Sequence, residues 1–69
     1  MNIMDREEIL RSELDVLREE HRSLDGEIAE AEGAPLPDRL AITRMKKRKL
    51  MLKDRIARIE DQLYPDIIA

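Results

Sequence analysis

The stretch that decides the fold is LRSELDVLREEHRSLDGEIAEA, residues 10–31. Apolar residues recur along it in alternating steps of four and three residues, with one polar residue, His21, in the series. Residues 42–63, ITRMKKRKLMLKDRIARIEDQL, repeat this spacing with Lys49 as the polar exception. The two stripes are Leu10, Leu14, Leu17, His21, Leu24, Ile28 and Ala31, and Ile42, Met45, Lys49, Leu52, Ile56, Ile59 and Leu63. This is the a and d spacing of helices that pack along a shared seam.

Capping residues mark the first helix, which we expect over about residues 5–32. Asp5 and Glu8 have the spacing of a capping box, in which side chains accept hydrogen bonds from free backbone N–H groups. Gly33 is expected to close the helix in a left-handed turn. Gly26 lies inside and costs about 1 kcal/mol relative to Ala, but the seam spacing continues past it, so one unbroken helix is predicted.

The second helix is expected over about residues 38–63. Pro37 suits a first turn, where no N–H partner is needed, and Asp38 can cap the helix or complement its dipole. Tyr64-Pro65 should end the helix, because proline disfavours helical geometry in the residue before it.

The connector, residues 33–38, is short enough to make the two helices antiparallel neighbours. The predicted fold is therefore all-α. It is a single domain over residues 1–69, folded as an antiparallel two-helix coiled-coil hairpin. The tail, residues 64–69, is partly apolar and can pack back on the hairpin.

Pairing the stripes around a fold-back near Leu36 gives a register that the neighbouring charges support. The predicted layers are Leu10/Leu63, Leu14/Ile59, Leu17/Ile56, His21/Leu52, Leu24/Lys49, Ile28/Met45 and Ala31/Ile42. The flanking pairs are Glu20/Arg55, Glu27/Arg48, Asp25/Lys46, Glu32/Arg39 and Arg11/Glu60, with one like-charged pair, Arg18/Lys53. Each exposed pair contributes roughly 0.2–1 kcal/mol, so the charges select the register more than they add stability.

Several apolar residues lie outside the stripes and would be exposed on a lone hairpin. They are Ile9, Val16, Leu36, Leu40, Leu50, Met51 and Ala57. Exposed apolar patches mark interfaces, and a chain this short buries only about 60% of its unfolded surface. We therefore expect a homo-oligomer, with a dimer favoured, in which two hairpins form a four-helix bundle.

Composition excludes several classes of protein. The 69 residues contain no Cys, which excludes disulfides and thiolate metal sites, and Tyr64 is the one aromatic residue. No apolar run approaches the roughly 18 residues that cross a bilayer. A cytoplasmic protein without a membrane partner is the expectation.

His21 and Lys49 fall in neighbouring layers of the predicted seam. With Glu20 and Asp25 they would form a polar stratum, and such polar seam residues specify register and oligomeric state. His21 and Asp25 could instead share a metal or relay a proton, but two ligands make a weak site. The sequence contains no nucleophile–base pair, phosphate loop or zinc motif. We expect no catalytic residue, no metal and no cofactor, and hence no enzyme.

Charge is segregated between the two halves. Residues 1–32 hold four basic and eleven acidic residues, whereas residues 39–58 hold nine basic residues and one acid. The simplest interpretation is that the two helices neutralise each other. Arg44, Lys47 and Arg58 would remain outward, and clustered cations of this kind bind phosphates. A nucleic-acid-associated accessory protein is therefore the alternative function.

Two segments resemble a known family. Residues 20–28, EHRSLDGEI, are similar to the E-H-x-x-L-D-x-x-I stretch of the YdcH-like family of short bacterial proteins. Residues 45–56, MKKRKLMLKDRI, are similar to that family's L-K-K-x-K-L-x-L-K-D-x-I stretch, with Met45 in place of Leu and Arg55 where an acid is common. The family is a domain of unknown function, so the resemblance implies a cytoplasmic helical hairpin and no assigned reaction.

The functional prediction is a small non-enzymatic helical interaction module of unknown pathway. It would self-associate, bind a protein partner through its apolar edges, or do both.

Overall fold

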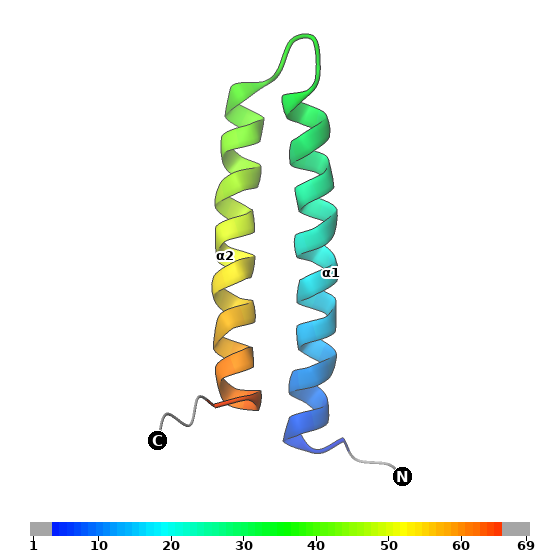
Figure 1. Ribbon diagram of the computed structural model, residues 1–69, viewed down its shortest axis with the longest axis vertical. Coiled ribbons are helices and arrows are strands. Elements are labelled where there is room, and N and C mark those ends of the chain that lie inside the picture. Colours follow the sequence, from blue (N-terminus) through cyan, green and yellow to red (C-terminus); the bar gives the residue numbers. More distant parts are fainter. Residues whose placement is uncertain (1–3, 66–69) are drawn as a thin grey trace.

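The computed structural model describes residues 4–65 and consists of two helices packed against each other as a hairpin (Figure 1). Helix α1 spans Arg6–Glu32 and helix α2 spans Arg39–Leu63. No strand occurs in the described part of the chain. The all-α hairpin predicted from the two stripes is confirmed. The predicted packing of residues 66–69 lies outside the described residues.

Helix α1 begins with the predicted cap. The Asp5 side chain accepts a hydrogen bond from the backbone N–H of Glu8 at 2.8 Å, and Glu7 and Glu8 place negative charge in the first turn. Carboxylates there interact favourably with the positive end of the helix dipole. The helix continues through Gly26 without a break.

The end of α1 differs from the prediction. Gly33 has φ −84° and ψ −5°, so it is right-handed and not left-handed. Its N–H donates to the carbonyl of Ala29 at 3.1 Å, and the N–H of Ala34 donates to Ala31 at 3.4 Å. Helix-like hydrogen bonds therefore satisfy these last carbonyls, and no left-handed residue is needed.

Helix α2 begins at Arg39, one residue after the expected start at about residue 38. Asp38 is the cap, with its carboxylate accepting from the N–H groups of Leu40 and Ala41 at 3.1 Å each. Pro37 precedes the cap and lies outside the first turn. The helix ends at Leu63, directly before the Tyr64-Pro65 pair that was expected to stop it.

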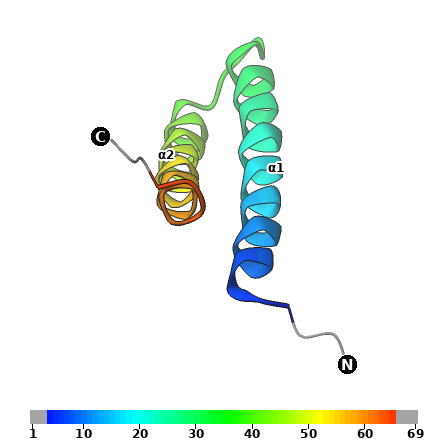
Figure 2. The same cartoon turned by 60° about the horizontal axis from the view of Figure 1, so that its bottom comes forward.

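The core is one row of side chains along the seam. Its buried members are Leu14, Leu17, Leu24, Ile28, Ile42, Leu52 and Ile59. Every residue of the two predicted stripes is buried or half-buried, which confirms the stripes. Outside them, only Ala41 and Glu60 of residues 4–65 are not exposed. Because the helices lie side by side in both views, neither broad face of the described hairpin is covered (Figures 1 and 2).

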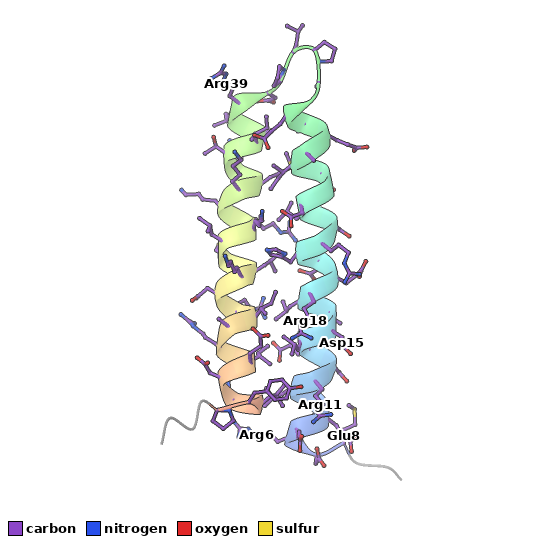
Figure 3. The ribbon with its side chains drawn as sticks, in the orientation of Figure 1. Arg6, Glu8, Arg11, Asp15, Arg18 and Arg39 are labelled. Carbon is purple, nitrogen blue, oxygen red and sulfur yellow. The ribbon has the colours of Figure 1, made fainter. Side chains whose placement is uncertain are left out.

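The charged pairs beside the seam are not the predicted ones. The ion pairs that join flanking residues of the two helices are Arg18–Glu60 at 2.9 Å, Lys46–Glu32 at 3.2 Å and Arg55–Glu13 at 3.4 Å. The predicted pairs for Glu60, Lys46 and Arg55 are Arg11–Glu60, Lys46–Asp25 and Arg55–Glu20. Arg11 instead pairs with Glu7 on its own helix, at 2.8 Å. Figure 3 shows Arg39, predicted opposite Glu32, pointing away from α1.

Each observed partner lies one heptad from the predicted one. Arg55 pairs one heptad nearer the start of α1, whereas Glu60 and Lys46 pair one heptad nearer its end. If one helix had slid along the other, all three pairs would be displaced in the same direction. The displacement instead comes from long side chains that reach diagonally over about 10 Å of helix.

Candidate functional site

A cluster of three polar side chains crosses the middle of the seam. Lys49 of α2 forms an ion pair with Oδ1 of Asp25 on α1. On the same helix as Asp25, His21 lies one turn away, with its Nδ1 3.8 Å from Oδ2 of Asp25. One carboxylate therefore lies between the two polar residues that interrupt the apolar stripes.

The cluster follows from where each residue lies on its helix. Lys49 is on the seam, yet its side chain keeps 36% of its surface exposed, because the aliphatic stem follows the seam while the ammonium reaches water. Asp25 stands beside the seam. Its pKa is lowered, first by the hydrogen bond from Lys49. Desolvation opposes this, and the electrostatic interactions of the carboxylate with Lys49 and His21 add to it.

His21 is only partly satisfied. Its side chain is 26% exposed, and its Nε2 is buried without a hydrogen-bond partner in the described structure. Glu20, predicted as a member of the polar stratum, faces a different groove, which it lines together with Val16 and Arg48. The structure thus brings His21, Asp25 and Lys49 together and leaves Glu20 on the other side of the seam.

The cluster opens to solvent along an uncovered groove. This groove lies between the helices and is lined by Asp25, Ile28, Ala29, Glu32, Lys46, Lys49, Leu50 and Lys53. Over residues 4–65, no three His, Cys, Asp or Glu side chains come together as a metal site would require. Chemically, the three groups can hold a charge balance across the seam.

The interface candidates are exposed in the structure. Fractional exposure is 67% for Leu50, 68% for Met51, 57% for Val16 and 92% for Leu36, which lies in the connector. Ile9, Leu40 and Ala57 are exposed as well. These side chains are divided between both sides of the seam and the connector, and no single patch contains them all.

The predicted nucleic-acid residues are exposed, and one of them has a partner. Arg58 pairs with Asp54 on its own helix at 3.0 Å. Within the described residues, Arg44 and Lys47 form no ion pair. The three side chains therefore make a sparse group on the exposed surface of α2.

A stripe of arginines, which the sequence reasoning missed, runs beside the seam on α2. Arg44, Arg48, Met51, Arg55 and Arg58 recur at steps of four and three residues, and all are exposed. On the opposite side of the same seam lie Lys46 and Lys53, which line the groove of the polar cluster together with the seam residue Lys49. The stripe was missed because Arg and Lys were counted together as cations. Marking the heptad positions of Arg and Lys separately would have revealed it.

The arginine stripe faces acids of α1 across a second groove. Its lining is Val16, Glu19, Glu20, Ser23, Leu24, Glu27, Arg48 and Leu52. The buried side chains of Leu24 and Leu52 form the floor. We call this side of the hairpin the arginine flank, and the side with Lys46, Lys49 and Lys53 the lysine flank.

Neither helix is long and apolar enough to cross a membrane, as judged over the described residues. A family model described as "Protein of unknown function (DUF465)" matches residues 14–60, which is more than half of the chain. The YdcH-like proteins belong to that family, so the resemblance noted in the sequence is confirmed. No curated protein and no solved structure matches the chain.

Proposed function

The chain belongs to the DUF465 family of proteins of unknown function, and from that premise we propose that it is a non-enzymatic helical module that acts by association. Its proposed form is a homodimer in which two hairpins make a four-helix bundle. The cytoplasm is the proposed location, which fits a sequence without Cys.

The single-row core carries this proposal. Seven buried side chains form the core of the described hairpin, while large apolar side chains such as Leu50 and Met51 stay more than half exposed. Domains of this size are marginal unless disulfides, metals or association add stability. Covering a broad face with a second copy would add a second layer to the core, which is the usual solution for helix pairs.

The open position of the polar cluster supports a role without catalysis. A lysine becomes a nucleophile or base when a pocket removes it from water. About a third of the Lys49 side-chain surface stays exposed to water, and its charge is neutralised by Asp25. We therefore propose that the cluster specifies how helices pair and takes part in no reaction.

Mass measurement tests the association. The chain has a mass of 8.1 kDa, so light scattering at tens of micromolar should report twice this value. Circular dichroism on the same sample should confirm that the chain is helical. Melting temperature should also rise with protein concentration, because association stabilises the folded state by mass action. A helical, monodisperse 8.1 kDa species with a concentration-independent melt would contradict the proposal.

The arginine stripe favours nucleic acid as the second candidate function. Guanidinium groups bind phosphates in a bidentate manner, and Arg44 has no ion-pair partner in the described structure. A labelled RNA or DNA should then shift at low ionic strength and be released as salt rises. Failure to bind at about 50 mM salt would remove this candidate.

A further inference from the structure

The two helices present opposite charges as parallel stripes on the arginine flank. On α1, the exposed residues of that flank are Glu13, Val16, Glu20, Ser23, Glu27 and Glu30, again at steps of three and four residues. Arg55 contacts Glu13 at 3.4 Å, and Arg48 lines a groove with Glu20 and Glu27, which places both stripes on one side of the seam. The flank is therefore half acidic and half basic, divided along the seam.

Ion pairs join the two helices along the lysine flank, whereas the middle of the arginine flank has none in the described structure. Arg18–Glu60, Lys46–Glu32 and Lys49–Asp25 cross the lysine flank along most of its length. On the arginine flank, Arg55–Glu13 and the hydrogen bond from Arg6 to Gln62 cross near the open end of the hairpin. Nearer the connector, no such bond joins α1 and α2 on this flank within residues 4–65.

Two charge pairs predicted within one chain are missing from this open region. Glu20 was expected opposite Arg55, and Glu27 opposite Arg48. In the described structure Arg55 bonds Glu13 instead, and Arg48 forms no ion pair. Glu20, Glu27 and Arg48 therefore remain available to another molecule, with Glu27 and Arg48 at matching levels along the hairpin.

We propose that a second copy of the chain covers the arginine flank, with the two hairpins side by side and their connectors at the same end. This inference rests on the proposed self-association and adds its geometry. A two-fold axis along the hairpin places α2 of one copy over α1 of the other at the same level. Arg44 then meets Glu30 and Arg48 meets Glu27 of the second copy.

The other two-fold arrangement opposes like charges. With the connectors at opposite ends, α1 would lie on α1 and α2 on α2. The stripe containing Glu20 and Glu27 would then face its own copy, and the stripe containing Arg48 would face another arginine stripe. Like charges held close at an interface are repulsive, so the charge pattern selects the first arrangement.

The same pattern favours a second copy over a polyanion. A phosphate backbone would be attracted by Arg44 and Arg48 but repelled by Glu20 and Glu27, which line the same groove as Arg48. A copy of the chain satisfies both stripes at once. It also covers Val16 and Met51, the half-exposed apolar side chains of this flank.

A spin-label distance tests the geometry. Leu36 is 92% exposed in the connector, and the chain has no Cys, so Leu36→Cys can carry a single nitroxide. The 27 residues of α1 span about 40 Å. Connectors at the same end should give a label-to-label distance below about 25 Å, whereas opposite ends should give about 40 Å or more. Light scattering on the labelled sample reports the mass.

The outcomes separate the two proposals. A dimer with the short distance supports both, and a dimer with the long distance overturns the geometry but leaves self-association standing. A helical monomer overturns both. If that monomer binds RNA in a salt-sensitive manner, the arginine flank is a binding surface for a polyanion instead.

Charge reversal tests the contact between Arg48 and Glu27. Arg48→Glu should raise the dimer dissociation constant about tenfold or more, because the contact occurs twice in a symmetric dimer. Adding Glu27→Arg should restore the dissociation constant to within about threefold. Lys47→Glu, the same charge change on a residue outside the flank, is the matched control. Dimerisation unaffected by Arg48→Glu in a helical variant would overturn the proposed interface.

Discussion

Lys49 of α2 is neutralised by Asp25 of α1, so the one lysine on the apolar seam has its partner on the facing helix. The same carboxylate lies 3.8 Å from His21, the other polar residue of the seam. The two polar residues of the stripes therefore meet through a third residue that stands beside the seam. Over residues 4–65, Lys49–Asp25 is the only ion pair between the helices that involves a seam residue.

The first prediction concerns the pKa of Asp25, which lies below its ordinary value of 3.8 because Lys49 bonds the charged form. A group with a lowered folded pKa stabilises the fold above its unfolded pKa, and that contribution is lost as pH falls through the folded pKa. Stability should therefore decline as the solution is acidified below about pH 4. An NMR titration of the Asp25 carboxyl measures the pKa directly.

The matched variants for this prediction are two lysine substitutions. Lys49→Leu should return the pKa of Asp25 toward its ordinary value, because the hydrogen bond that lowers it most is removed. Lys47→Leu removes the same charge from another face of α2, which does not contact Asp25, and should leave that pKa in place. Equal titration curves for Asp25 in wild type and Lys49→Leu would contradict the ion pair.

The second prediction is that His21→Leu stabilises the hairpin. Nε2 of His21 is buried without a partner in the described structure, and an unsatisfied buried polar group costs roughly 1–3 kcal/mol. Leu in the same layer keeps the apolar contacts, so the free energy of unfolding should rise by about 1 kcal/mol. Urea unfolding at one fixed protein concentration measures it, and His21→Asn, which stays polar, should show no gain. A lower midpoint for His21→Leu would mean that Nε2 has a partner in solution.

The fold was predictable because it depends on spacing, which the sequence displays directly. The alternation that runs from Leu10 to Ala31 defines one face of a helix whatever the details of its contacts. Helix ends were less predictable, because a single backbone residue decides them. Gly33 can be left-handed but is not obliged to be, and Pro37 can stand on either side of the cap.

The charged contacts were less predictable still. The seam register predicts which backbone positions are level with each other. Arg55 and Lys46, however, have side chains long enough to pair with an acid one heptad from the predicted one. Within the polar cluster, Asp25 was identified correctly as a neighbour of His21 because both lie on one helix face. Glu20 is next to His21 in sequence yet lines the groove on the other flank from Asp25, because successive helix residues are turned by about 100°.

The third prediction compares one substitution at a buried and an exposed leucine. Leu14 is a core residue that is 2% exposed, whereas Leu50 is 67% exposed on the lysine flank. Leu14→Ala should cost about 2–5 kcal/mol, which is much of the stability of a small domain. Leu50→Ala should change the free energy of unfolding by less than about 1 kcal/mol. Thermal unfolding followed by circular dichroism compares them, and equal losses would contradict the single-row core.

The fourth prediction concerns the two glycines, both of which can accept a side chain. A Cβ at Gly26 would meet no atom within 4 Å, and this residue lies inside α1. Gly26→Ala should therefore stabilise the hairpin by about 1 kcal/mol, because Ala loses less backbone freedom in a helix. Gly33 has a negative φ, and a Cβ there would lie 3.4 Å from the Ala29 carbonyl oxygen, an ordinary contact. Gly33→Ala should then be neutral or stabilising by about 0.4–1 kcal/mol, and urea unfolding measures this. A decrease in the free energy of unfolding of more than about 1 kcal/mol would instead indicate the left-handed turn that the sequence first suggested.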